Sequence, residues 1–262
     1  MKQINSPNPA CGQFEVQALT HPGSRDFFHL YLKAPGWEYR PGQFVMIRPA
    51  DWGNDPVWPR PFSICEQTEN SLRLFIQVIG RGTDLISRLQ PGSLVNLWGP
   101  LGNGFRYDPG ESLYILAGGM GIAPFMGLCK THPHPEQISL LFGHRVDIGC
   151  YPFAELPGKI YKKHLKQNTP AEIVDFQEVL KKEIQGFAGR GRVLACGPTP
   201  FLRVIREYAN KFRADCLLSL ENKMACGVGA CLGCAAKTGS GDFVQTCTHG
   251  PVFRSDEVVL ES

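Results

Sequence analysis

Four cysteines near the end of the chain constrain its fold more than any other feature. Three of them lie in the run MACGVGACLGC at residues 224–234, and the fourth follows after twelve intervening residues. This C-x4-C-x2-C…C spacing is typical of a [2Fe–2S] cluster, in which four thiolates hold two irons. The loop is rich in glycine, which permits the positive φ values that a tight cluster-binding loop requires. The sequence therefore predicts a metal centre ligated by Cys226, Cys231, Cys234 and Cys247.

Cysteines with this spacing could also bind zinc or form disulfides. A zinc site usually takes two short C-x2–4-C pairs, and here the pair Cys231 and Cys234 fits best, while the other spacings are four and twelve residues. A disulfide framework belongs to secreted proteins, but the opening residues MKQINSP have no apolar signal-peptide core, so we expect a cytoplasmic protein. We expect most of the other cysteines to be small buried hydrophobic residues: Cys11, Cys65, Cys129, Cys150, Cys196 and Cys216.

Composition limits the remaining possibilities. With 262 residues, the chain has room for two ordinary domains and a small appendage. A hydrophobic content of 43% and a charged content of 19% are those of a folded protein with substantial cores. A net charge of +3 without any basic run argues against a nucleic-acid partner. No apolar segment approaches the ~20 residues of a membrane span.

Short apolar segments separated by turns fill the first hundred residues. Pro-Gly dipeptides at 41–42 and 91–92 mark turns just ahead of two of these segments. Helical periodicity is confined to 83–89. Several short strands with a single helix predict a closed antiparallel barrel. The expected strands are residues 14–18, 27–33, 43–48, 72–78 and 94–98.

Two motifs in this region offer chemistry beyond that of a barrel. The run RPFS at 60–63 places a cation, a rigid residue, an aromatic ring and a hydroxyl in a row, a set that could pair with a phosphate and bind a flat ring. The run GRGT at 80–83 is a glycine-rich turn that opens the predicted helix and could hold a pyrophosphate. Each motif alone is also explained by ordinary structure, as a strand with a surface arginine or as a capped helix. Together they indicate a barrel that could hold a flavin.

From residue 112 the pattern becomes that of an α/β layer. Residues 113–117 are a continuous apolar strand that runs into the glycine turn GGMGIAP at 118–124. A strand, a glycine turn and a helix in this order can bind a dinucleotide pyrophosphate, although the spacing is not G-x-G-x-x-G. Alternating strands and helices predict a parallel sheet. We expect further strands at 138–143, 192–197 and 216–220, and helices at 125–130, 176–184 and 199–212.

Two further positions could contact a nucleotide. The strand at 192–197 leads into Pro198 at the carboxyl edge of the sheet, where ligands bind in such folds. Cys196 there could flank a reacting ring or could simply be packed in the core. Arg145 could contact a 2′-phosphate or be an ordinary solvated arginine, whereas Asp147 would suit a free ribose hydroxyl. The choice between NAD and NADP therefore stays open.

The motifs occur in the order found in the ferredoxin–NADP reductase superfamily, and the chain resembles the electron-transfer subunits of class B dihydroorotate dehydrogenases within it. RPFS is similar to the flavin motif R-x-[YFIL]-[ST], and GPLGNGF at 99–105 to the joint between the two domains. Residues 118–124 and 196–198 resemble the nucleotide loop and the C-G-P motif. Most specific are SLENKMACG at 219–227 and GPVF at 250–253, which resemble the subunit's S-x-E-x-x-M-A-C-G and D-G-P-V-F. The resemblance covers nearly the whole chain.

The resemblance implies an α+β multidomain fold that binds FAD, a [2Fe–2S] cluster and NAD. It divides the chain into an antiparallel FAD-binding β-barrel at 1–106, an NAD-binding α/β domain with a parallel sheet at 107–218, and a small C-terminal [2Fe–2S] module at 219–262. The positions expected to bind FAD or NAD are Arg60, Pro61, Phe62, Ser63, Ile76, Gln77, Val78, Gly82, Thr83, Gly118, Gly119, Gly121, Cys196, Gly197 and Pro198.

The function that the resemblance implies is electron transfer in pyrimidine biosynthesis. An FMN-containing dihydroorotate dehydrogenase catalytic subunit would supply electrons, which would pass through the cluster and FAD to NAD+. Two copies of each chain would form the assembly. Nicotinamide takes electrons in pairs and the cluster takes them singly, so a flavin is expected between the two. No residue is expected to act as an acid or base on dihydroorotate itself.

Three departures from the family pattern and two rival functions accompany this prediction. Residues 50–58 are unusually rich in tryptophan, Phe62 replaces a smaller aliphatic residue, and residues 149–153 match no motif.

One rival to this function is an FAD/[2Fe–2S] NAD(P)H oxidoreductase subunit that serves a ferredoxin- or sulfide-linked partner. The other is a zinc-stabilised binding module without flavin, which would be colourless.

Overall fold

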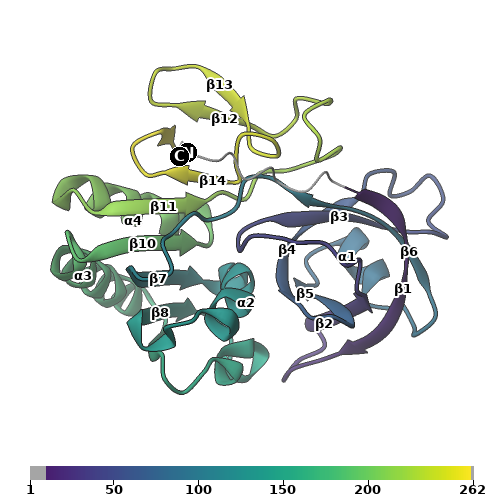
Figure 1. Ribbon diagram of the computed structural model, residues 1–262, viewed down its shortest axis with the longest axis horizontal. Helices are drawn as coiled ribbons and strands as arrows, with labels where there is room; N and C mark the ends of the chain where they lie inside the picture. The colour runs from purple at the N-terminus through teal and green to yellow at the C-terminus, as the bar shows by residue number, and fades with distance from the viewer. Residues whose placement is uncertain (1–9, 261–262) are drawn as a thin grey trace.

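Residues 10–101 close into a barrel whose interior is filled by apolar side chains. The computed structural model describes residues 10–260, and in it the barrel has the strand order β1-β2-β5-β4-β3-β6 (Figure 1). Leu30, Ile47 and Leu97 are among its fully buried residues. Its elements are β1 (Ala10–Thr20), β2 (Phe27–Lys33), β3 (Phe44–Pro49), β4 (Arg60–Gln67), β5 (Ser71–Gln77), α1 (Arg81–Ile86) and β6 (Leu94–Leu101). The predicted antiparallel barrel with one helix is confirmed.

One barrel strand was absent from the sequence prediction. β4 carries the RPFS motif and pairs with β3, with Pro61 opposite Met46. The first four side chains of β4 are only partly buried, because they line a cavity, although Phe62 also packs against the barrel core. The strand therefore lacks the alternation of apolar and polar residues by which strands are recognised, and its second residue is a proline, which strand patterns disfavour.

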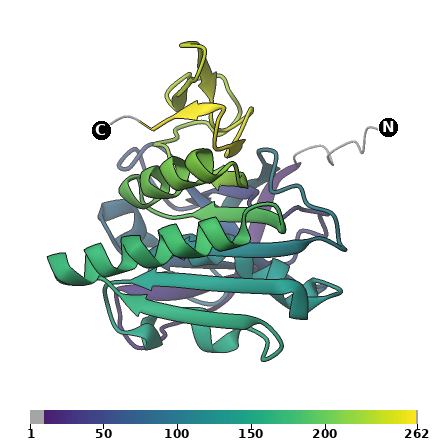
Figure 2. The same cartoon turned by 90° about the vertical axis from the view of Figure 1, so that its left-hand side faces the viewer.

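The second layer is a six-stranded sheet in the order β14-β11-β10-β7-β8-β9, and its five strands other than β14 run parallel (Figure 2). The predicted parallel sheet is thus confirmed, with β9 added at an edge where polar and exposed residues concealed it. The strands are β7 (Ser112–Gly118), β8 (Ile138–His144), β9 (Tyr161–Lys166), β10 (Gly191–Cys196), β11 (Asp215–Ser219) and β14 (Val252–Arg254).

Helices cover both faces of this sheet. Figure 2 shows α3 and α4 side by side across one face, where Leu180 and Ile205 pack on Leu116. α2 lies on the other face, between the sheet and the barrel (Figure 1). The main helices are α2 (Ala123–Thr131), α3 (Pro170–Phe187) and α4 (Thr199–Phe212), with short 3-10 turns η1 (Gly119–Ile122), η2 (Pro135–Gln137), η3 (Ile148–Cys150) and η4 (Pro152–Glu155). α3 begins earlier than predicted because Thr169 and Glu172 form a capping box.

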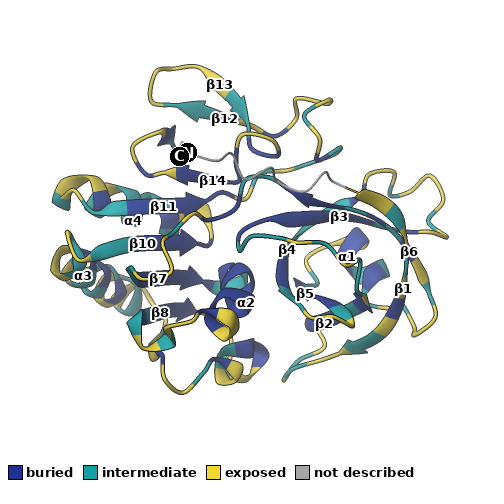
Figure 3. Cartoon of the chain, in the orientation of Figure 1, coloured by how far each residue is buried: buried dark blue, intermediate teal, exposed yellow. Residues whose placement is uncertain are grey.

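The C-terminal segment builds a small three-stranded sheet, β13-β12-β15, from β12 (Ala235–Thr238), β13 (Phe243–Gln245) and β15 (Val258–Val259). Between β13 and β15 the chain returns to the main sheet, where β14 pairs antiparallel with β11. This strand ties the cysteine-bearing segment to the α/β layer. Figure 3 shows the buried barrel and sheet strands in dark blue and the largely exposed C-terminal loops in yellow.

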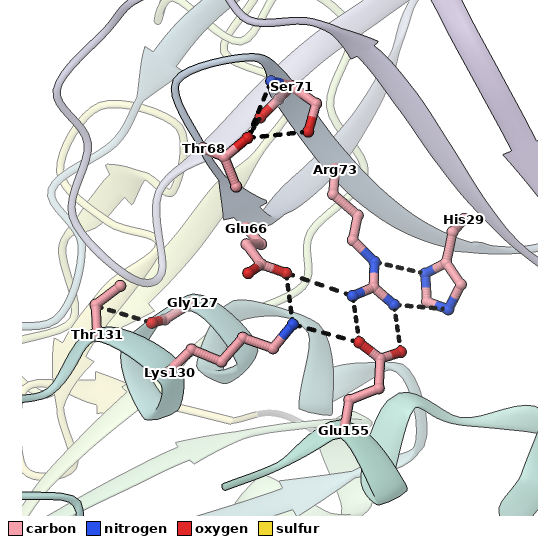
Figure 4. A network of polar contacts seen from close by, with 9 residues as sticks. All are labelled: His29, Glu66, Thr68, Ser71, Arg73, Gly127, Lys130, Thr131 and Glu155. Atoms are coloured by element: carbon pink, nitrogen blue, oxygen red, sulfur yellow. Dashed lines mark hydrogen bonds and ion pairs between the residues drawn. The ribbon is translucent and has the colours of Figure 1, made fainter.

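A buried polar network joins the barrel to the α/β layer (Figure 4). Arg73 on β5 donates to both carboxylate oxygens of Glu155 at 2.6 Å, and its side chain is only 6% exposed. Lys130 on α2 binds Glu66 on β4 at 2.8 Å and Glu155 at 3.3 Å. Arg73 also contacts the ring of His29. Because charged groups from both layers meet here, the network fixes one layer against the other.

Charge and burial set the protonation of this network. Burial and the positive charge of Arg73 lower the pKa of His29 to about 4, so the ring is neutral at pH 7. The Arg73 guanidinium lowers the pKa of Glu155 to about 2. Within residues 10–260, no helix is long and apolar enough to cross a membrane.

Candidate functional site

A cavity of about 1380 Å³ lies between the barrel and the α/β layer. Its walls come from β4 of the barrel, from the glycine turn after β7, and from the segment after β11 that leads to the cysteine loop. The volume exceeds the ~300–1,000 Å³ of most small-molecule sites, so the cavity has room for a cofactor and a second ring beside it.

Most of the predicted cofactor-binding positions meet at this cavity. The predicted positions that line it are Arg60, Pro61, Phe62, Ser63, Ile76, Gln77, Thr83, Gly118, Gly119, Cys196 and Pro198. The other four predicted positions, Val78, Gly82, Gly121 and Gly197, are not part of its lining. Sequence positions more than a hundred residues apart are therefore brought to one place by the packing of the two layers.

Gly82 matters through the space it leaves. A Cβ at this position would lie 2.5 Å from Nε of Arg60, so only glycine lets the guanidinium rest against the first turn of α1. Arg60 is also held by its Nη1, which donates to the carbonyl oxygen of Trp58 at 2.6 Å. The cation is thus fixed in the cavity wall, where it could pair with a phosphate.

Thr83 holds the turn rather than presenting a free hydroxyl. Its Oγ1 accepts from the N–H groups of Ile79 at 2.9 Å and Gly80 at 3.2 Å, and it donates to the carbonyl of Gly80 at 2.9 Å. These three bonds use the hydrogen-bonding capacity of the hydroxyl. The side chain therefore shapes the cavity wall.

The glycines of the α/β layer allow two loops to touch. A Cβ on Gly121 would lie 2.1 Å from the carbonyl oxygen of Cys196, and one on Gly197 would lie 3.1 Å from the backbone of Gly118. Gly119 has a φ of 54°, in the region that favours glycine. The turn after β7 and the end of β10 consequently form one continuous cavity wall.

Cys196 contributes a neutral thiol to that wall. It is 2% exposed, and burial raises the pKa of its thiol well above the ordinary range. Ser219 lies beside it on the neighbouring strand and hydrogen-bonds to the thiol. The predicted placement of Cys196 at the ligand-binding edge of the sheet agrees with this geometry.

The cavity also has lining residues that the sequence analysis did not assign to a cofactor. Glu221 lines the cavity. Trp58 and Ile79 also line the cavity and are exposed. Arg145, for which the sequence left a contact with a 2′-phosphate open, lines it just after the end of β8. Asp147 instead caps η3, accepting from Gly149 N at 2.8 Å. A single acid or aromatic residue has no spacing pattern, so only its neighbourhood in the fold marks it.

The cysteine loop directs its own backbone at the sulfurs. Cys226 Sγ accepts from the N–H groups of Val228 and Cys231, both at 3.4 Å. Cys247 Sγ accepts from Gly229 N at 3.2 Å, and Cys234 Sγ accepts from Cys247 N at 3.4 Å. Such donors stabilise the negative charge of thiolates, which is what the sulfurs of an iron–sulfur cluster carry.

Positive backbone φ angles make this arrangement possible. They are 74° at Gly227, 81° at Gly229 and 55° at Leu232, the last an uncommon value for a residue with a side chain. The glycine content of the loop, noted in the sequence, thus has the predicted structural use.

The four cysteines form two pairs. Cys226 is hydrogen-bonded to Cys231, and Cys234 to Cys247. Within residues 10–260, no three His, Cys, Asp or Glu side chains converge as the ligands of one metal ion would. Two pairs suit two irons that take two thiolates each better than a single zinc ion.

The pKa values of the cysteines respond to the same surroundings. Burial opposes ionisation of Cys226, but the N–H groups of Val228 and Cys231 outweigh it and lower the pKa to about 7. Burial and the neighbouring Cys234 raise the pKa of Cys247 to about 12. A bound cationic centre would hold all four as thiolates, so the residues present fit a cluster.

The cysteine loop is pressed onto the barrel. A Cβ on Gly227 would lie 2.5 Å from Met46 of β3, and Trp98 of β6 donates to the carbonyl of Cys226 at 3.1 Å. Cys234 and Cys247 are buried against Met46 and other apolar side chains of the barrel. Phe44 and Met224, which pack in the same cluster as Cys234 and Cys247, also line the cavity.

Two asparagines anchor the segments on either side of the loop. Asn103, in the GPLGNGF run, donates to the carbonyls of His249 and Val252 and accepts from Val252 N at 3.1 Å. Asn222 donates to Thr246 Oγ1 at 2.9 Å. The GPLGNGF run, which resembles the joint between the two domains of the family, thus also holds the C-terminal segment on the barrel through Asn103.

A barrel and a parallel sheet that share one cavity, with a cysteine loop packed on the barrel, give the chain the fold of ferredoxin–NADP reductases. Solved structures agree with this fold. A structure of an NADH-dependent reduced ferredoxin–NADP oxidoreductase matches with a TM-score of 0.78 at 24% identity, covering 94% of this chain and 90% of that one. Phthalate dioxygenase reductase matches with a TM-score of 0.62 at 17% identity, covering 90% and 76%.

Sequence relatives narrow the class to a family. The model of the iron–sulfur cluster binding domain of dihydroorotate dehydrogenase B matches residues 221–259. The dihydroorotate dehydrogenase B (NAD(+)) electron transfer subunit of Caldanaerobacter subterraneus subsp. tengcongensis is 30% identical over 90% of this chain and 93% of its own. That of Geobacillus kaustophilus is 33% identical over 84% and 87%. The chain belongs to the family of dihydroorotate dehydrogenase B electron transfer subunits.

Proposed function

We propose that this chain transfers electrons between a catalytic subunit that oxidises dihydroorotate and NAD+. The observation that carries the proposal is the continuity of one segment: residues 219–224 line the cavity, and the chain then enters the cysteine loop directly. A cluster held by the cysteine loop would therefore be joined through a short segment to a flavin held by the barrel. The names of the family members, which specify an electron transfer subunit and NAD(+), support the same function.

The bound groups supply complementary chemistry, because a flavin exchanges electrons singly or in pairs, the cluster only singly and nicotinamide only in pairs. The protein's own residues position these groups. Arg60 would neutralise the pyrophosphate of FAD, and Phe62 and Ser63 would contact the flavin end of the cavity. The turn at 118–121 would receive the nicotinamide dinucleotide. Cys196 keeps its proton on Sγ beside that turn, which avoids a second negative charge near the phosphates.

Water exclusion is a second task of the protein. Phe44, Met46 and Leu101 surround the buried pair Cys234 and Cys247 on the barrel side. A dry, fixed environment tunes a cluster through its hydrogen bonds and its exposure. Cys231 is exposed, so we propose that the partner meets the loop at this residue.

The assembly follows from the same proposal. We assign dihydroorotate oxidation to an FMN-containing partner, since none of the cavity residues has an assigned acid or base role towards that substrate. An assembly with two copies of each chain, a cytoplasmic location, NAD(H) as the nucleotide, and boundaries near residues 106 and 218 remain predictions. The cofactor-binding residues given above are part of the proposal.

Reconstitution tests this function. The full chain, loaded with FAD and iron, should oxidise NADH with an artificial dye but should not respond to dihydroorotate. Adding an FMN-containing dihydroorotate dehydrogenase catalytic subunit from a relative's operon or genome should give dihydroorotate-dependent NAD+ reduction.

The rival partners give a different result. Reduction of a ferredoxin or of a sulfide-linked acceptor by NAD(P)H, with no response to dihydroorotate in the presence of the catalytic subunit, would leave the reductase fold standing and would refute the pyrimidine assignment. A colourless protein that binds zinc and no flavin would refute the whole proposal.

A further inference from the structure

We infer that Trp98, on the barrel strand β6, is a positioning residue that raises the reduction potential of the cluster through the backbone at Cys226. The inference rests on the proposed binding of a cluster, and it concerns a residue outside the cysteine loop. The indole Nε1 of Trp98 donates to the carbonyl oxygen of Cys226 at 3.1 Å. The two residues are 128 positions apart in the sequence, so the docking of the loop on the barrel brings them together.

The barrel holds the indole in place. Trp98 lies opposite Met46 of β3 on one side and opposite Cys11 of β1 on the other. Its ring is partly buried and packs on the apolar cluster that contains Cys234 and Cys247. Because a packed ring on a strand paired on both sides has little room to turn, the barrel sets the direction of the indole N–H.

The carbonyl that Trp98 binds belongs to the peptide group between Cys226 and Gly227. Because a peptide group is planar, a hydrogen bond to its oxygen also fixes the direction of the Gly227 N–H. The Cα of Gly227 is held as well, since a Cβ there would lie 2.5 Å from Cγ of Met46. With a φ of 74° at Gly227, the next N–H, that of Val228, donates to Cys226 Sγ at 3.4 Å.

This N–H group is what links the indole to the cluster. A reduced cluster carries one more negative charge than an oxidised one, and hydrogen bonds to its sulfurs stabilise that charge and raise the reduction potential. Trp98 acts through the Val228 donor, because its own N–H is used by the carbonyl of Cys226. The barrel that would hold the flavin thereby also adjusts the cluster.

Trp98→Phe tests this role, because it keeps an aromatic ring beside Met46 and removes the N–H donor. The full chain is purified with its flavin and cluster, and the cluster is titrated electrochemically while its electron paramagnetic resonance signal is followed. Iron content should equal that of the wild type. The ratio of reduced to oxidised cluster at a fixed applied potential should fall about 2- to 10-fold, which for a one-electron couple lowers the reduction potential by up to about 59 mV.

A second measurement needs no cluster, so it stands even where a variant loses iron. In the iron-free full chain, hydrogen exchange of the backbone amides around Val228 should be about 2- to 10-fold faster in Trp98→Phe than in the wild type. Exchange in β3 should be the same in both proteins. Equal exchange around Val228 would overturn the inference, since it would mean that the indole does not hold this turn.

Trp37→Phe is the matched control, because Trp37 is a partly buried tryptophan that packs against the barrel core. It should change neither the potential nor the exchange. An unchanged potential in Trp98→Phe with full iron would overturn the inference, and so would an equal decrease in both variants. Either result would leave the proposed function standing, whereas a wild-type chain that binds zinc in place of iron would refute that function and the inference with it.

Discussion

At the residue scale, the orientation of a few backbone N–H groups prepares the cysteine loop for a cluster. Val228 and Cys231 both donate to Cys226, and Gly229 donates to Cys247. Positive φ angles at Gly227 and Gly229 turn these N–H groups towards the sulfurs. The loop is therefore pre-organised for negative sulfurs.

Cys226→Ser should remove the cluster. The variant loses one of two ligands of one iron, so we expect most of the iron and sulfide to be lost from the purified protein, together with the red-brown colour. Iron analysis and the visible spectrum measure this. Cys11→Ser, at an exposed cysteine on β1 outside the loop, is the control and should keep the full iron content. Full iron in both variants would contradict the ligand assignment.

Gly82→Ala tests the seat of Arg60. The new methyl group would meet the guanidinium, which as the end of a flexible side chain would have to move away. Since Arg60 would be displaced from the cavity wall, FAD affinity should fall about 5- to 150-fold. Gly80→Ala has open space around it and should bind FAD normally. Equal affinity of the two variants would mean that the position of Arg60 is irrelevant to the flavin.

Residue identities could be predicted from the sequence where spacing carries them. The cysteines and the glycine turns have fixed intervals, so they were found. Glu221 and Trp58 each stand alone in the sequence, and their position at the cavity depends on how the barrel meets the sheet. Thr83 was predicted as a cofactor contact, but its hydroxyl bonds to the backbone of the turn at Ile79 and Gly80, which only the structure reveals.

At the scale of elements, the network of ion pairs around Arg73 joins the barrel to the α/β layer. Removal of one partner from a buried pair usually costs about 3–5 kcal/mol. Glu155 is 39% exposed and keeps Lys130, so Arg73→Met should lower the free energy of unfolding by only about 2–3 kcal/mol. Arg88→Met removes an exposed pair with Asp84 and should change it by less than about 0.5 kcal/mol. Urea unfolding compares them.

The network also makes the fold sensitive to acid. His29 has a pKa of about 4 when folded, against 6.5 for the ordinary group, so between these values the unfolded chain binds more protons. Stability from His29 is therefore present above pH 6.5 and is lost as the pH falls towards 4. Glu155 adds a loss below about 4.5, because its folded pKa is about 2.

His29→Gln isolates the histidine contribution. Between pH 7 and pH 5 the wild type should lose ~1–2 kcal/mol of unfolding free energy that the variant keeps. Unfolding curves at the two pH values measure the difference. Equal losses in the two proteins would show that the His29 ring is not held neutral in the fold.

Elements were predictable where periodicity expresses burial. The apolar strands at the centre of the sheet and the barrel were found for this reason. β4 and β9 were not among the predicted strands, because β4 lines a cavity and β9 lies at a polar edge of the sheet. β14 is only three residues long, and it pairs with β11, from which it is far apart in the sequence.

At the scale of the whole molecule, two layers and a cysteine loop meet around one cavity. The sequence predicted this layout through the order of its motifs, because each motif belongs to a known element of the resembling family. The shape of the cavity and the docking of the loop on Met46 and Trp98 required the structure. The proposed division of labour with a catalytic partner depends on this arrangement.

The most direct test of the central claim is purification of the native protein with whatever it binds, followed by flavin extraction and an assay for NAD+ reduction. If this chain transfers electrons from a dihydroorotate-oxidising subunit to NAD+, we expect FAD and FMN in similar amounts, a second chain that carries the FMN, and NAD+ reduction that depends on dihydroorotate. FAD and iron without FMN, and no response to dihydroorotate, would contradict it.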